Sequence, residues 1–109
     1  MRHAYAQDAV LHLASDADIA APGGAITTEL CGRGEHEPPC PLAPHHTAAR
    51  RAGSEVHLRI LFATETERET QVRERIGRAL ARWDVRSCTA GSVRPEEQAH
   101  AGRLAASPS

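Results

Sequence analysis

Residues 55–63, with the sequence EVHLRILFA, constrain the fold of this chain more than any other segment. Every second side chain from the second position onward is large and apolar: Val56, Leu58, Ile60 and Phe62. A period of two is typical of a β-strand that buries one face. The segment therefore predicts a central strand, and its second face carries His57, Arg59 and Leu61.

An amphipathic helix is predicted directly after this strand. Thr64 and Thr66 are each followed three residues later by a glutamate, which is the spacing of a capping box. Glu69 and Arg73 lie four residues apart, as in an ion pair on the exposed side of a helix. The apolar residues recur at the helical period: Val72, Ile76, Ala79 or Leu80, and Trp83.

Shorter patterns predict three further strands, at residues 10–13, 25–31 and 85–89. Residues 15–24 contain turn-forming residues throughout, including the sequence Pro-Gly-Gly, so we expect a hairpin-like connection between the first two strands. Pro95 and the two glutamates after it favour another short helix, because proline and acidic side chains suit a helical first turn.

These segments together predict an α+β protein with a small, mainly antiparallel sheet. The expected order is strand, strand, long loop, strand, helix and strand, with the one amphipathic helix packed on one face of the sheet. We expect a single domain over residues 1–94, with a Cys/His/Pro-rich loop at 31–53, and a short C-terminal helix or flexible tail over residues 95–109. The second face of the sheet is expected to carry four polar side chains: Thr27, Glu29, His57 and Arg59.

The long loop begins with the most distinctive stretch of the chain, residues 31–46, CGRGEHEPPCPLAPHH. Four prolines within it exclude the interior of a helix or of a central strand. Two of the three cysteines and three of the seven histidines of the chain also lie there. Thiolate and imidazole groups are the ligands that Zn²⁺ prefers, usually four of them in a tetrahedron. The stretch therefore predicts a zinc site.

Two cysteines and two histidines would complete such a site without water, which is typical of structural zinc. The predicted ligands are Cys31, His36, Cys40 and either His45 or His46. Neighbouring residues of an extended chain point to opposite sides, so only one of the last two is expected to bind the same ion. Glu35 and Glu37 flank His36 and could orient its ring from outside the ligand set.

Three other interpretations of this loop are open. Its thiols and imidazoles could be incidental, or Cys31 and Cys40 could form a redox pair if their sulfur atoms come within bonding distance. An open zinc site could also activate water. No complete set of nucleophile, base and electrophile is recognisable, so an enzyme is not expected. Cys88 is expected to be a small buried hydrophobe, and His57 would be the first ligand to add from outside the loop.

The composition leaves few other function classes. The formal net charge of -1 and the pI near 6.6 provide no overall attraction for nucleic acid. The N-terminal residues lack the long apolar run of a secretory signal, and no segment could span a membrane. We therefore expect a cytoplasmic protein that binds neither nucleic acid nor membranes.

The core is expected to be thin, because only 3% of the 109 residues are aromatic. A bound metal or a partner subunit would compensate for limited apolar burial. The leading prediction is a small zinc-binding protein with a structural or recognition role. The alternative is a homodimeric interaction module without metal, in which a second copy or another protein covers the free face of the sheet.

Overall fold

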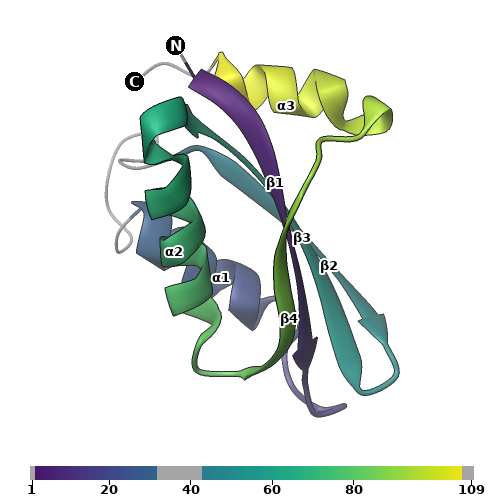
Figure 1. The fold of residues 1–109 in the computed structure, drawn as a ribbon. Helices are drawn as coiled ribbons and strands as arrows, with labels where there is room; N and C mark the ends of the chain where they lie inside the picture. The colour runs from purple at the N-terminus through teal and green to yellow at the C-terminus, as the bar shows by residue number, and fades with distance from the viewer. Residues whose placement is uncertain (1, 32–42, 107–109) are drawn as a thin grey trace.

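The computed structural model describes residues 2–31 and 43–106 (Figure 1). Two single turns of 3-10 helix, η1 at Thr66–Arg68 and η2 at Pro95–Glu97, precede the second and third α-helices. The main elements, in chain order, are β1 Arg2–His12, α1 Ala21–Cys31, β2 His45–Ala52, β3 Glu55–Glu65, α2 Glu69–Leu80, β4 Asp84–Gly91 and α3 Gln98–Ala105.

The four strands form one antiparallel sheet in the order β2-β3-β1-β4. The segments β1-α1-β2 and β3-α2-β4 each form a crossover between two strands that are not neighbours in the sheet. Strand β3 lies between β1 and β2, and strand β1 lies between β3 and β4. This is the ferredoxin-like, or split βαβ, arrangement. The predicted α+β class and antiparallel sheet are confirmed. The predicted order of elements is wrong, because a helix follows the first strand and a strand lies within the predicted loop.

The hydrophobic core lies between one face of the sheet and the helices α1 and α2. The predicted alternation of β3 is confirmed, since Val56, Leu58, Ile60 and Phe62 are all at most 2% exposed. Helix α2 buries the predicted apolar stripe, and Trp83 packs partly buried against the same core. Helix α1 adds Ile26 and Leu30 to this layer.

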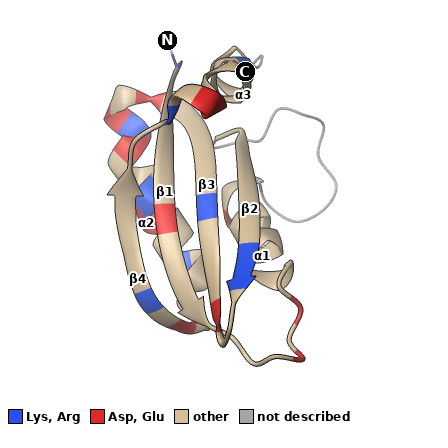
Figure 2. Ribbon diagram, turned by 90° about the vertical axis from the view of Figure 1, so that its right-hand side faces the viewer, with Lys and Arg blue, Asp and Glu red and all other residues tan. Residues whose placement is uncertain are grey.

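The second face of the sheet is covered only at one end, by α3. Figure 2 views the sheet from this side, with α3 across its upper end and the other two helices behind the strands. Leu61 and Ala63 of β3 are buried here, as is Ala101 of α3. The alternation of exposure along β3 therefore stops at Ile60, because both faces of the strand are covered beyond that point.

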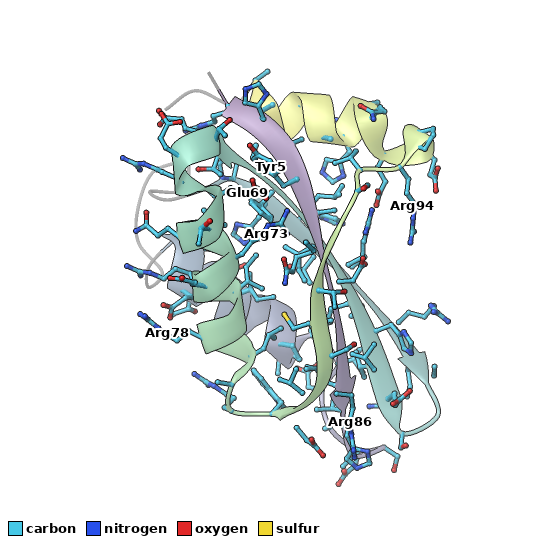
Figure 3. The ribbon with its side chains drawn as sticks, viewed as in Figure 1. Tyr5, Glu69, Arg73, Arg78, Arg86 and Arg94 are labelled. Carbon is cyan, nitrogen blue, oxygen red and sulfur yellow. The ribbon has the colours of Figure 1, made fainter. Side chains whose placement is uncertain are left out.

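Arg73 ties α2 to the sheet. Its Nε lies 2.8 Å from Glu69 Oε2, which confirms the predicted pair, and its Nη1 donates to the carbonyl oxygen of Ala6 at 2.8 Å. The guanidinium also lies over the rings of Phe62 and Tyr5, 5.2 and 5.8 Å from their centroids. Figure 3 shows Tyr5, Glu69 and Arg73 together at the N-terminal end of α2. The arginine thus joins the helix to the backbone and the rings of β1 and β3.

The prediction of a strand at residues 25–31 is wrong, because these residues belong to α1. Ile26 and Leu30 are both buried, and their spacing of four residues places them on one face of a helix. Pro22 lies in the first turn of α1, where a missing N–H costs nothing. The Pro-Gly-Gly sequence that predicted a turn is therefore part of the helix, and α1 is an α-helix that the sequence pattern did not predict.

Other boundaries also differ from the predictions. The first strand begins at Arg2, not at residue 10, and residues 45–52 of the predicted loop form β2. Thr64 lies in β3 and Thr66 in η1, and neither side chain caps the helix that follows. Thr66 Oγ1 instead accepts a hydrogen bond from the hydroxyl of Tyr5 at 3.3 Å.

The strand predicted at residues 85–89 is confirmed as β4, and Pro95 does begin a short helical segment. Cys88, predicted to be buried, is exposed instead. The reason is its position, since β4 lies at the edge of the sheet and all of its residues are exposed or partly exposed. The Cys88 sulfur accepts a hydrogen bond from Gln7 Nε2 at 3.1 Å.

Candidate functional site

The predicted ligands divide between described and undescribed parts of the chain. Cys31 is the last residue of α1, and His45 and His46 are the first residues of β2. His36 and Cys40, together with Glu35 and Glu37, lie outside the described residues. The described part of the predicted site therefore consists of the end of α1 and the start of β2.

Strand β2 is held against β3 where it begins. The backbone N–H of Ala63 donates to the carbonyl oxygen of Pro44 at 3.0 Å, and His45 pairs in register with Phe62. Ala43 and Pro44 are buried just before the strand. The position of the His45 backbone is thus fixed by the sheet, on the side that α1 covers.

Both ring nitrogens of His45 have protein partners. Nδ1 lies 3.1 Å from the carbonyl oxygen of Ala43, and Nε2 lies 3.0 Å from Thr27 Oγ1 on α1. A carbonyl oxygen only accepts hydrogen bonds, so Nδ1 carries a proton. In the neutral ring, Nε2 then has the lone pair and accepts from the hydroxyl of Thr27.

The His45 ring is held in its neutral form. Burial lowers the pKa of His45 below its ordinary value, and the charge of His46 lowers it further, although the hydrogen bond to Ala43 acts in the opposite direction. A neutral imidazole with Nδ1 protonated and a lone pair on Nε2 is the form that binds a metal through Nε2. It is also the form that accepts a proton.

A hollow of about 470 Å³ lies between the start of α1 and β2. Thr47 Oγ1 is buried near it without a hydrogen-bond partner among the described residues, although its side chain packs close to Gly23. The residues around the hollow are mostly small or polar: Ile19, Ala20, Gly23, Thr27, His45, His46, Thr47 and Ala49. His45 is therefore reachable from solvent through a small recess.

His46 faces the other side of the sheet from His45. Its ring lies 4.7 Å, centroid to centroid, from the ring of His100 on α3, at an angle of 56°. The alternation along β2 thus separates the two neighbouring histidines, as their adjacency in an extended segment predicted. Only His45 points to the side on which α1 ends.

Thr27 is a partner of His45 that the sequence pattern does not reveal. The pattern predicts Thr27 and Glu29 in a strand, on the free face of the sheet, whereas both lie on α1. Glu29 Oε1 is 3.5 Å from Arg75 Nη1 and 3.6 Å from Arg78 Nη1 of α2. The four-residue spacing of two apolar side chains, at 26 and 30, is the sequence signal that favours a helix here.

His57, the first additional ligand expected from outside the loop, lies on the uncovered face. It pairs in register with Val10, and its Nε2 is 3.8 Å from Glu55 Oε1. His45 lies on the helix-covered face, so the two imidazoles are on opposite sides of the sheet. His57 is therefore not placed to join a site at His45.

A charged cluster beside α3 has a structural role. Arg59 Nη2 and Nε bind the two carboxylate oxygens of Glu97, at 2.7 and 3.1 Å, and Nη1 binds Asp8 at 2.9 Å. Arg59 Nη2 also donates to the carbonyl oxygen of Ser92. These contacts hold the pKa of Glu97 at about 2 and raise that of Arg59. With its donors used in this way, Arg59 fastens the start of the C-terminal helix to the sheet.

Within residues 2–31 and 43–106, no three His, Cys, Asp or Glu side chains come together so that they could hold a metal ion. In the same part of the chain, no helix is both long and apolar enough to cross a membrane. Comparison with protein-family models, with curated proteins and with solved structures found no match. The site must therefore be judged on its own chemistry.

Proposed function

We propose that this chain is a small metal-binding protein in which Cys31, His36, Cys40 and His45 bind zinc. The ion would fasten the long loop to the helix and the strand that bracket it. The biological role would then be structural or one of recognition. One observation carries this proposal: the His45 ring donates from Nδ1 to the carbonyl oxygen of Ala43.

That hydrogen bond supports the proposal because metal-binding histidines almost always donate their second ring nitrogen to a carbonyl or carboxylate oxygen. The bond fixes the tautomer and the orientation of the ring before any ion binds. It leaves Nε2 of His45 as the nitrogen with a lone pair, and the lowered pKa keeps that lone pair unprotonated at neutral pH. In the absence of metal, the hydroxyl of Thr27 would donate a hydrogen bond to this lone pair.

The position of α1 gives further support. Thr27 Oγ1 is 3.0 Å from His45 Nε2, and Cys31 follows Thr27 by four residues, about one helical turn along α1. The backbone of Cys31, a predicted thiolate ligand, therefore lies about one helical turn from the residue that contacts His45. His36 and Cys40 would come from the loop itself.

Among the two adjacent histidines, we assign the ligand to His45. His46 faces the opposite side of β2, toward His100. A set of two thiolates and two imidazoles would leave no position for water, so we propose a structural site. Glu35 and Glu37 remain proposed partners of the His36 ring.

The alternative, a homodimeric interaction module, has less support. Among the described residues, Val85 is the one large hydrophobic side chain that is exposed, at 38%. The uncovered sheet face carries Arg50, His57 and Glu55, and a partner copy would have to pair these polar groups or remove their water at a cost. An extended apolar patch, which typically marks such an interface, is not formed by the described residues.

The test is the metal content of protein purified without a histidine tag. We expect about one equivalent of zinc, as a single tetrahedral site requires. His45→Ala and Cys40→Ala should each lose the ion, whereas His57→Ala, an imidazole on the opposite face of the sheet, should retain it. A chelator should lower the unfolding temperature of the wild-type protein and of His57→Ala, but not that of His45→Ala or Cys40→Ala.

Two results would overturn the proposal. One is metal-free protein whose unfolding temperature is the same with and without chelator. The other is a zinc content that stays at the wild-type value after both His45→Ala and Cys40→Ala. Sedimentation of the same samples tests the alternative, because a dimer that chelator does not affect would favour the interaction module.

A further inference from the structure

His46 and His100 bring two imidazoles together on the side of the sheet opposite His45. His46 comes from the edge strand β2 and His100 from the middle of α3. Their ring centroids are 4.7 Å apart and their planes are inclined by 56°. The two ring planes are therefore inclined to each other and do not form a parallel stack.

The ring nitrogens of His46 and His100 form no hydrogen bond or ion pair within the described structure, residues 2–31 and 43–106. His46 is exposed and His100 is half-buried, so water and ions can reach both rings. In this respect they differ from His45, whose two ring nitrogens both have partners.

The separation of the ring centroids is compatible with two imidazoles that bind a single ion. With a metal–nitrogen distance of about 2.0–2.1 Å, the centre of each ring lies about 3.2 Å from the ion. Two such rings at ligand–metal–ligand angles of about 90–109° have their centres about 4.5–5.2 Å apart. The observed 4.7 Å lies within this interval.

Both backbones are fixed by contacts that do not involve these rings. The strand β2 is paired with β3 along its whole length. Helix α3 is anchored by buried Ala101 and, at the turn before it, by the contacts of Glu97 with Arg59. An ion would therefore meet two ligands that are already close together, and little ordering of the chain would be needed to bind it.

We propose that His46 and His100 form a second binding site, for a divalent late transition metal such as Zn²⁺, Ni²⁺ or Cu²⁺. Imidazole is a ligand that suits these ions, whereas Ca²⁺ and Mg²⁺ prefer oxygen. Two protein ligands leave the remaining coordination positions to water or to an external ligand. The site lies on the other side of β2 from the zinc site proposed above and does not depend on it.

Binding at this site would fasten α3 to the edge strand. A ligand that binds only the folded arrangement stabilises it by mass action. Helix α3 would then be held by the bridged histidines in addition to buried Ala101 and the Arg59–Glu97 ion pair. We expect the metal to slow the opening of α3, seen as slower hydrogen exchange of its amides.

The test is a titration of the full-length protein with ZnCl₂, followed by imidazole ¹⁵N chemical shifts. One nitrogen each of His46 and His100 should shift together and saturate together, and MgCl₂ should move neither. His46→Ala or His100→Ala should weaken this second binding step by about tenfold or more, because one of two imidazole ligands is lost. His57→Ala, which removes an imidazole from the same sheet face, is the matched control.

The ring signals separate this proposal from the earlier one. If His46 and His100 shift while Cys40→Ala has no effect on zinc content, the second site stands and the loop site fails. If saturating zinc leaves both rings unchanged, or if only one of them shifts, the two histidines merely pack together and the second site is refuted. The second site is equally refuted if His46→Ala or His100→Ala leaves the second binding step intact.

Discussion

Arg59, in the middle of the sheet, binds both carboxylate oxygens of Glu97, at the turn that leads into α3. The side chains are only 14% and 17% exposed. This pair links the central strand β3 to the C-terminal part of the chain, and Asp8 of β1 contacts the same guanidinium. Together with buried Ala101, this contact fixes the position of α3, and with it that of His100.

The stability of the protein should therefore fall in acid as Glu97 becomes protonated. Its pKa is lowered from 4.5 to about 2, so the folded state binds this proton less readily than the unfolded state. The stabilisation is complete above pH 4.5 and is lost as the pH falls from there toward 2. We expect about 1–2 kcal/mol from this group, because water still screens the pair.

Urea unfolding of Glu97→Gln at a series of pH values measures this contribution. The variant should lose that free energy at pH 7 and should show a flatter decline in acid than the wild type. Glu96→Gln is the control, since Glu96 is an exposed neighbour in the same turn. If the unfolding free energy of Glu97→Gln falls with pH in acid as steeply as that of the wild type, the Arg59–Glu97 pair contributes nothing to stability.

Thr27→Val tests the role of the His45 ring. Valine has nearly the same shape and helix propensity as threonine but cannot donate to Nε2. If Nε2 is a zinc ligand, the hydroxyl competes with the ion, and its removal should tighten zinc binding by about 1 kcal/mol, or roughly fivefold. Competition with a coloured chelator measures this affinity.

Thr28→Val provides the comparison for that experiment. Thr28 is the next residue of α1, and its hydroxyl donates to the carbonyl oxygen of Gly24 within the helix. It does not contact His45, so zinc affinity should be unchanged. Weaker zinc binding in Thr27→Val than in Thr28→Val would indicate that Thr27 supports the site and does not compete with the ion.

Ile26→Ala tests whether α1 is a helix that buries one face in the hydrophobic core. Ile26 is 0% exposed, so its truncation should leave a cavity and cost about 2–4 kcal/mol of unfolding free energy. Thr28→Ala, at an exposed position of the same helix, should cost less than about 1 kcal/mol. Equal costs at both positions in thermal or urea unfolding would contradict the orientation of α1.

Cys88 should react in the folded protein. Its side chain is exposed on the edge strand β4, where its sulfur accepts a hydrogen bond from the amide of Gln7. We expect alkylation of native protein, followed by peptide mass mapping, to label Cys88 without denaturant. Cys88→Ser should change the unfolding free energy by less than about 0.5 kcal/mol, as is usual for surface substitutions. Protection of Cys88 until the protein unfolds would instead indicate a buried thiol.

The candidate site is predictable from sequence only in outline. The cluster of cysteines and histidines marks residues 31–46, and the alternation of an extended chain separates His45 from His46. The partners of His45 could not be predicted, because Thr27 contributes a side chain from a segment whose short local pattern fits a strand as well as a helix. The nearness of His46 to His100 likewise depends on α3 packing over β3 and β1, which no local pattern encodes.

The sequence by itself determined β3 and α2, where enough apolar residues recur to distinguish a period of two from a helical period, and it predicted β4 from a shorter run of β-type residues. It did not determine α1, because a short segment with apolar side chains at 26 and 30 satisfies either period. Only the tertiary structure decided that segment. A helix there buries Ile26 and Leu30 beside α2, whereas the sheet already has its four strands and pairs β2 at its edge. The physical reason is that burial of apolar surface outweighs the weak local preference of a short segment.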